Sequence, residues 1–106
     1  MSNTITSTNK KWSDNMKNVD VLVAFINGES GARTRTLYID GNKLFNYNTC
    51  IAERTLEDDG DSFVVNVSKY SNATTTMQNA LLRMIPNPEN KLRCVVEIPQ
   101  GADSLS

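Results

Sequence analysis

The stretch SFVVNVSKYSNATTTMQNALLRMIP, residues 62–86, decides how the rest of this chain folds. Residues 63–67 form an apolar run typical of a buried strand, and a polar corner leads from it into a helix that Pro86 ends. Steps of four, three, one and three place five apolar residues on one helical face, Ala73, Met77, Ala80, Leu81 and Met84. We therefore expect an amphipathic helix that covers a sheet made by the other segments.

The other apolar segments have the length and pattern of short strands. Residues 19–27 are apolar on both faces, residues 32–39 alternate, and further strands are expected at 43–47, 51–55 (or a bent continuation of 43–47) and 92–98. Turns such as Asn27-Gly28 and Asp40-Gly41 separate them, as in hairpins. The sequence thus predicts an α+β fold, with an antiparallel sheet of five to six short strands and one amphipathic helix packed across one face.

A chain of 106 residues has room for one core. We expect a flexible N-terminal arm over residues 1–18, a single α+β domain over 19–99 and a flexible tail over 100–106. Trp12 either folds back onto the core or anchors a partner. The arm lacks the apolar core of a signal peptide and no run is long enough to cross a bilayer, which favours a cytoplasmic protein without a membrane partner.

The composition argues against an enzyme. The chain has no histidine, which is the commonest general base and metal ligand, and its two cysteines, Cys50 and Cys94, lack metal-site spacing. We expect both cysteines to be reduced core residues, possible neighbours on adjacent strands. No catalytic residue, metal or cofactor is predicted.

One turn concentrates negative charge. The net charge is −1, but without the four acids of this turn the remainder carries +3, from 11 bases and 8 acids. An acidic corner of this kind is a candidate partner-binding surface, or it only keeps the hairpin soluble. The turn resembles a fragment of a calcium-binding loop but lacks its closing glutamate, so we expect a plain hairpin turn. The predicted corner consists of Glu57, Asp58, Asp59 and Asp61.

Two other groups of residues are alternative sites. Arginines two apart on a strand share a face, so a basic platform for single-stranded nucleic acid is predicted from Arg33, Arg35, Lys43 and Arg54. A helix start rich in hydroxyls attracts anions, so a polar pocket for a nucleotide or other small ligand is predicted from Asn48, Arg54, Asn66, Lys69, Tyr70 and Thr74. The alternative is that these polar groups only satisfy one another.

Three motifs carry a family resemblance, which covers residues 28–85. Tyr-Asn-Thr-Cys-Ile-Ala-x-Arg at 47–54, Val-Asn-Val-Ser-Lys-Tyr-Ser at 65–71 and Thr-Thr-x-Gln-Asn at 75–79 resemble a family of small domains from bacteriophage and mobile elements. The resemblance implies no catalytic residues. It implies a phage-type, non-enzymatic protein that binds and inhibits a host protein in the host cytoplasm, CRISPR and other defence effectors included, or that acts on the phage genome or transcription machinery. A homodimer is left open.

Overall fold

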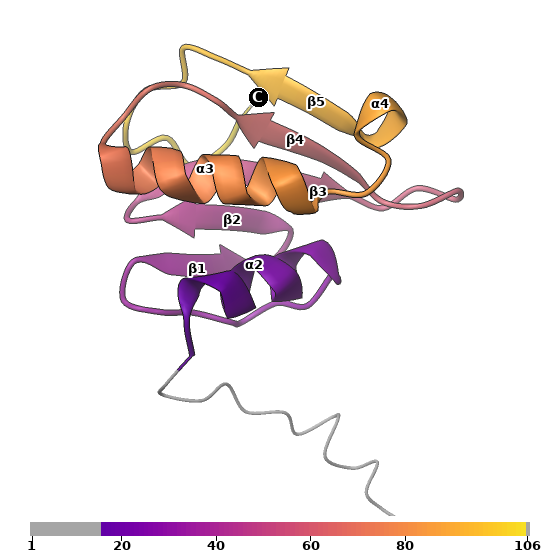
Figure 1. Cartoon of the computed structure of the whole chain (residues 1–106), viewed down its shortest axis with the longest axis horizontal. Coiled ribbons are helices and arrows are strands. Elements are labelled where there is room, and N and C mark those ends of the chain that lie inside the picture. Colours follow the sequence, from indigo (N-terminus) through magenta and orange to yellow (C-terminus); the bar gives the residue numbers. More distant parts are fainter. Residues whose placement is uncertain (1–15, 106) are drawn as a thin grey trace, which may run out of the picture.

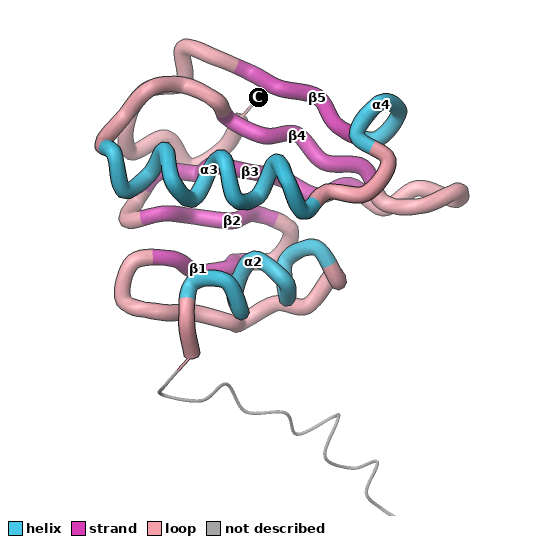
Figure 2. Tube along the Cα trace, in the orientation of Figure 1, coloured by secondary structure: helices cyan, strands magenta, loops and turns pink. Residues whose placement is uncertain are grey.

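The computed structural model describes residues 16–105, which form a five-stranded sheet with helices packed on it (Figures 1 and 2). The strands are β1 (Leu37–Asp40), β2 (Lys43–Asn46), β3 (Thr49–Thr55), β4 (Ser62–Asn66) and β5 (Leu92–Val95). The helices are α2 (Asn18–Ile26), α3 (Asn72–Met84) and the single turn α4 (Pro88–Lys91). The predicted α+β class is confirmed.

The sheet is mixed rather than wholly antiparallel. Its order is β1-β2-β3-β4-β5; the first three pairs are antiparallel, and β5 runs parallel to β4. Helix α3 causes this difference, because it returns the chain to the end of the sheet where β4 began (Figure 1). A strand, a helix and a second strand in succession form the usual parallel crossover.

The prediction of a strand at residues 19–27 is wrong, because this segment is helix α2. The buried side chains Val21, Leu22, Ala24 and Phe25 follow the i, i+1, i+3, i+4 spacing of one helical face. The backbone N–H of Lys17 donates to the Asp20 carboxylate at 2.9 Å, which satisfies one free donor at the helix start. Met16 also packs against the core, so the domain extends into the predicted arm, whose residues 1–15, including Trp12, lie outside the described range.

The predicted strand at 32–39 is shorter than expected. Only Leu37–Asp40 forms a full strand, and residues 32–34 lie along its outer edge instead. The Ile39 N–H donates to the Ala32 carbonyl at 3.1 Å, and the Thr34 N–H donates to the Leu37 carbonyl at 2.7 Å. The chain itself therefore covers the β1 edge of the sheet.

Helix α3 confirms the predicted amphipathic helix, with a buried face rotated by about one residue. Ser71 caps the start through its Oγ, which accepts from the Thr74 N–H at 3.2 Å. The residue before Pro86 is extended, as proline requires, and the helix ends there. The fully buried positions are Thr74, Gln78 and Leu81, whereas Met77, Ala80 and Met84 are partly buried and Ala73 is exposed, contrary to prediction.

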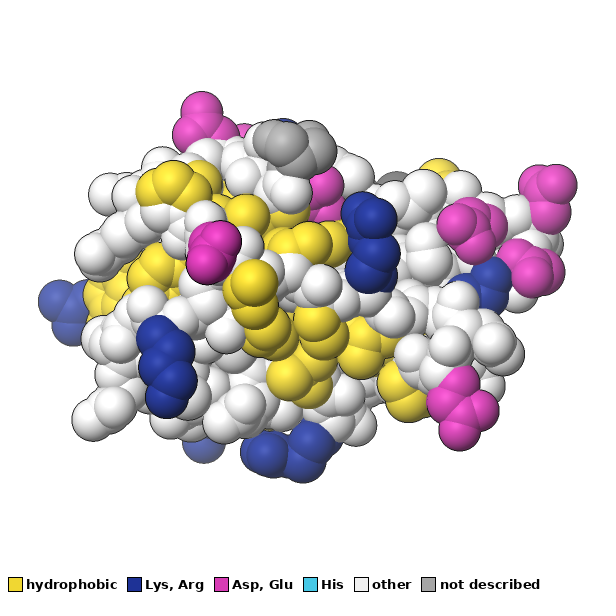
Figure 3. Space-filling view, turned by 90° about the horizontal axis from the view of Figure 1, so that it is seen from above, with side chains coloured by type: hydrophobic (Ala, Val, Ile, Leu, Met, Phe, Trp, Pro, Cys, Tyr) yellow, Lys and Arg dark blue, Asp and Glu magenta, His cyan; other side chains and the backbone are white. Residues whose placement is uncertain are grey.

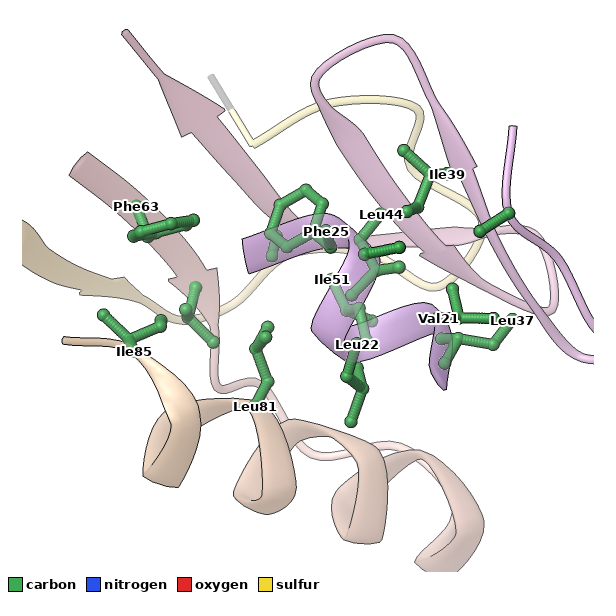
Figure 4. Close-up of a cluster of buried hydrophobic side chains, with 14 residues drawn as sticks. Val21, Leu22, Phe25, Leu37, Ile39, Leu44, Ile51, Phe63, Leu81 and Ile85 are labelled. Atoms are coloured by element: carbon green, nitrogen blue, oxygen red, sulfur yellow. The ribbon is translucent and has the colours of Figure 1, made fainter. Parts of the chain in front are cut away.

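The main core lies between the sheet and the two long helices, which cover the same face (Figure 4). In this view Leu22 and Phe25 of α2 and Leu81 of α3 lie in one cluster with side chains of the strands. The rings of Phe25 and Phe63 lie 5.9 Å apart at 57°. This tilted arrangement is one that aromatic pairs prefer.

The residues after β5 cover the opposite face of the sheet, so residues 100–105 are not the predicted flexible tail. Leu105 is buried in a second cluster with Phe45 and Cys50. The Cys50 N–H donates to the Ala102 carbonyl at 2.8 Å, which fixes this segment along β3. Cys94 is exposed rather than in the core, because it lies on β5, the strand at the edge of the sheet.

Candidate functional site

The acidic corner forms the loop between β3 and β4, which projects beyond the helices in Figure 1. Acidic side chains gather at the same end of the molecule in Figure 3. We call residues 56–61 the acidic loop. The structure places all four predicted acids, Glu57, Asp58, Asp59 and Asp61, in this one loop.

Two cations hold the acidic loop in place. Lys91, at the end of α4, puts its Nζ 2.6 Å from Asp59 Oδ1 and 3.1 Å from Glu57 Oε1. On the other side of the loop, Arg54 Nη1 lies 3.0 Å from Asp61 Oδ2. Four acids and two bases leave the cluster a net charge of −2. The acidic corner is therefore a braced loop with a surplus of negative charge.

Lys91 acts as a brace because its own side chain is withdrawn from solvent. Its side chain is 13% exposed, whereas that of Asp59 is 80% exposed. The hydrogen bond from Lys91 holds the pKa of Asp59 below its usual value, and the same bond together with one to Glu57 raises the pKa of Lys91. The shifted pKa of Asp59 contributes to the stability of the fold. This contribution is present above the usual aspartate pKa and is lost as pH falls through the lowered pKa. That of Lys91 is present below the usual lysine pKa and is lost as pH rises through the raised one.

We expect Lys91→Met to move the titration of Asp59 to higher pH. The substitution removes the charged hydrogen bond that favours the carboxylate form. A carboxyl-carbon NMR titration of wild type and variant measures the midpoint. Lys69→Met is the matched control, since Lys69 is exposed and forms no ion pair with the loop. An Asp59 midpoint that is the same in wild type and Lys91→Met would show that the brace does not form in solution.

The acidic loop also presents an apolar side chain and a hollow. Leu56 is 74% exposed and directly precedes Glu57, and Asp58 is exposed without an ion pair in the described range. An open hollow of about 340 Å³ lies beside them, lined in part by Glu57, Lys91 and Arg93. An exposed apolar side chain surrounded by charges is able to contribute to a protein interface with a polar rim.

The predicted basic platform is not assembled. Arg33 and Arg35 are exposed, but residue 35 lies in a bend outside β1, so the two do not share a strand face. The Arg33 guanidinium carbon lies 5.9 Å from the centre of the Tyr38 ring, while Arg54 is engaged with Asp61 and its Nη2 donates to the Gly28 carbonyl at 3.5 Å. Lys43 is half-buried on β2. Arg33 and Arg35 are therefore the exposed members of the predicted platform, whereas Arg54 is paired with a carboxylate.

The predicted polar pocket is partly assembled and is filled by its own side chains. Asn66 Nδ2 donates to the Cys50 carbonyl at 3.1 Å and to the Tyr70 hydroxyl at 2.9 Å, and the Tyr70 hydroxyl donates to the Ile98 carbonyl. Thr74 Oγ1 donates to Asn46 Oδ1 at 2.6 Å. Within residues 16–105 no buried side-chain polar atom lacks a partner. The groups therefore satisfy one another, which was the alternative to a ligand site.

The remaining members of the predicted pocket lie elsewhere. Asn48 is exposed in the turn between β2 and β3, Lys69 is exposed in the link to α3, and Arg54 lies on the part of β3 that leads into the acidic loop. Asn48 directly precedes β3, which is seven residues long, and Arg54 lies near its other end. At about 3.3 Å per residue, a strand of this length keeps its ends far apart.

The described range brings together no group of metal-binding side chains. Among residues 16–105 no three cysteine, aspartate or glutamate side chains lie close enough to share a metal ion. Burial raises the pKa of the Cys50 thiol to about 11, so this cysteine is mostly protonated at neutral pH and is a poor nucleophile. No helix in the described part of the chain has both the length and the apolar character needed to cross a membrane.

Lys91, Leu56 and Gln78 matter for these sites but were missed by the sequence analysis. Lys91 is 34 residues from Glu57 and 32 residues from Asp59 in the sequence, so local spacing does not predict the contact. Gln78 donates to the carbonyls of Asn66 and Ser68, at 2.8 and 2.9 Å. Its position three residues after Thr75 fits a capping box, and this spacing gives no sign of the buried role.

No protein-family model, curated protein or solved structure matches this chain. The resemblance to bacteriophage and mobile-element domains therefore stays a prediction.

Proposed function

We propose that this protein is a non-enzymatic binding protein that docks its acidic loop against a basic surface of another protein. The observation that carries the proposal is the braced loop, in which Lys91 and Arg54 fix the backbone while a net charge of −2 remains. A loop that is already held in place loses less conformational freedom on binding. Complementary charge speeds association and selects the partner.

The exposed Leu56 favours a protein partner over a role in solubility alone. A loop selected only for solubility gains nothing from a leucine that is 74% exposed. At an interface, the same side chain buries apolar surface at the centre of a charged rim. Nucleic acid is disfavoured as the partner at this loop because phosphate carries the same sign of charge.

The sequence resemblance gives the proposal its context. A phage-type protein of this kind inhibits or modulates a host macromolecule in the host cytoplasm, and defence effectors of the CRISPR type, which present basic grooves to nucleic acid, suit an acidic loop. In this hypothesis the loop occupies a surface that otherwise meets phosphate. The hypothesis makes the protein an anti-CRISPR candidate.

We expect a loop variant with Glu57→Gln, Asp58→Asn, Asp59→Asn and Asp61→Asn to lose the partner. Wild type, this variant and the control Asp103→Asn, an exposed acid in the C-terminal segment, are immobilised and exposed to bacterial lysate. Proteins retained by wild type and control but not by the loop variant are identified by mass, purified, and titrated by calorimetry. We expect binding to weaken by about tenfold or more and to fall with salt.

Equal affinity of wild type and loop variant for every retained protein would refute the role of the acidic loop. Circular dichroism of the variant ensures that the loss reflects charge rather than unfolding. A gel shift with a single-stranded oligonucleotide at low salt tests the nucleic-acid alternative, for which binding would decline steeply as salt rises.

A further inference from the structure

One edge of the sheet is covered by another part of the chain, whereas the other edge is open in the described range. Residues 32–34 hydrogen-bond along the outer edge of β1, as described above. At the other edge, β5 pairs with β4 alone, and no other strand of the described range follows it. An edge strand presents free N–H and C=O groups that pair readily with another chain, so natural proteins usually protect it.

The register shows which backbone groups of β5 face outward. The Val95 carbonyl accepts from the Val67 N–H at 2.8 Å, so the backbone groups of Val95 point toward β4. Direction alternates along a strand, so the backbone groups of Cys94 and Val96 point away from the sheet. These outward groups are what a further strand would use.

Two apolar side chains of this edge are exposed. Val96 is 60% exposed and Cys94 is exposed. Figure 3, which looks onto the side of the molecule where β5 lies in Figure 1, shows apolar side chains in a band across this face. Residues 92–96 contain neither proline nor lysine, the residues that commonly protect an edge strand.

The sequence of this edge is complementary to itself. An antiparallel pairing of two copies centred on Val95 places Arg93 opposite the second copy's Glu97, and Cys94 opposite its Val96. Two such charge pairs arise by symmetry, and opposite charges that face each other stabilise strand pairing. Neither Arg93 nor Glu97 forms an ion pair within residues 16–105.

We infer that two copies of this chain form a dimer through β5, which joins their sheets into one continuous antiparallel junction centred on Val95. Glu97 is the last residue of this register, and its φ of 62° turns the chain away from the strand direction at that residue, which limits the junction to residues 93–97. The interface is isologous and uses the β5 edge of each copy, which is open within residues 16–105. The covered β1 edges then end the joined sheet on both sides, so a closed dimer forms rather than a fibre.

A charge-swap series tests the dimer and its register. Sedimentation equilibrium over a dilution series should give a mass that rises from 11.8 kDa toward twice that value. Arg93→Glu and Glu97→Arg each place like charges at both symmetric contacts, and each should weaken the dimer by about tenfold or more. The double variant restores both pairs with reversed signs and should recover most of the affinity.

Arg35→Glu is the matched control, because it makes the same charge change at an exposed residue far from β5 in the fold. A wild type that stays monomeric at all concentrations overturns the proposal. Single variants that dimerise like wild type, or a double variant that does not recover, overturn the register. All three changed side chains are exposed, and circular dichroism verifies that each variant is folded.

Cys94 supplies an independent test of the register. Pairing centred on Val95 puts the two Cys94 residues diagonally across the junction, with Cα atoms about 7–8 Å apart. This separation is too long for a disulfide but short enough for a small bismaleimide linker. We expect cross-linked dimer with the linker and none with Cys94→Ser, since Cys50 is buried. A disulfide-linked dimer after mild oxidation would instead place the centre at Cys94 and overturn the proposed charge pairs.

Discussion

Replacing Phe25 with alanine is expected to lower the free energy of unfolding by about 3–5 kcal/mol. The ring is 1% exposed and lies against Phe63, at the place where α2 covers the sheet (Figure 4). Its removal forfeits the burial of the ring and leaves a cavity that the neighbouring strands fill only in part. Urea denaturation followed by circular dichroism measures the change, and an unaltered slope with denaturant indicates that only stability has changed.

Val23→Ala is the matched control, and it separates the helix from the strand that the sequence predicted. In a strand, Val23 would share a face with Phe25 and its truncation would be destabilising. In α2, Val23 is 43% exposed on the side away from the core, and alanine has the higher helix propensity. We expect an effect within about 0.5 kcal/mol. A loss comparable to that of Phe25→Ala would contradict the helical assignment of residues 18–26.

The misassignment of α2 has a physical cause. Residues 19–26 are apolar at almost every position, so they fit a strand covered on both faces as well as a helix. Val19, Val21 and Val23 added β propensity, which packing against the sheet overrides. The distinguishing signal was Asp20, which caps the helix start through the Lys17 N–H. A side chain that caps a backbone N–H three residues earlier is typical of a helix start, and a strand has no such contact.

Helix α3 and strands β2 to β4 were predictable because local signals agree there. Ser71 and the threonines mark a helix start, Pro86 marks its end, and short turns separate the strands. The parallel pairing of β5 was also within reach, since a helix between two strands forms a crossover. The C-terminal segment was not, because residues 100–104 contain no apolar residue larger than alanine, and Leu105 is buried by the shape of the opposite sheet face.

The candidate sites show the same limit. The four acids of the acidic loop are adjacent in sequence, so their clustering followed directly. The basic platform failed because Arg35 lies in a bend and Arg54 has a nearby carboxylate, neither of which spacing reveals. The polar pocket was half right, because Asn66 and Tyr70 both belong to the corner between β4 and α3. Whether such groups bind a ligand or one another depends on distances that only the fold sets.

Replacing Asn66 with alanine is expected to lower the free energy of unfolding by about 2–4 kcal/mol, because buried partners left without a hydrogen bond cost roughly 1–3 kcal/mol each. The side chain is fully buried, and its Oδ1 accepts from the Ser68 N–H at 2.9 Å while its amide donates to the Cys50 carbonyl. Both backbone groups lose their partner in the variant. The network that joins β4, α3 and the segment after β5 would loosen as a unit.

Asn79→Ala on the exposed face of α3 is the matched control and should be neutral or slightly stabilising, because alanine favours the helix. Thermal unfolding monitored by calorimetry compares the two variants at the same pH. If Asn66 were a ligand-binding residue with a merely solvated amide, its alanine variant would be as stable as that of Asn79. A large loss at Asn66 alone therefore assigns the polar corner to the folding of the domain, which leaves the acidic loop and the β5 edge as the surfaces open to partners.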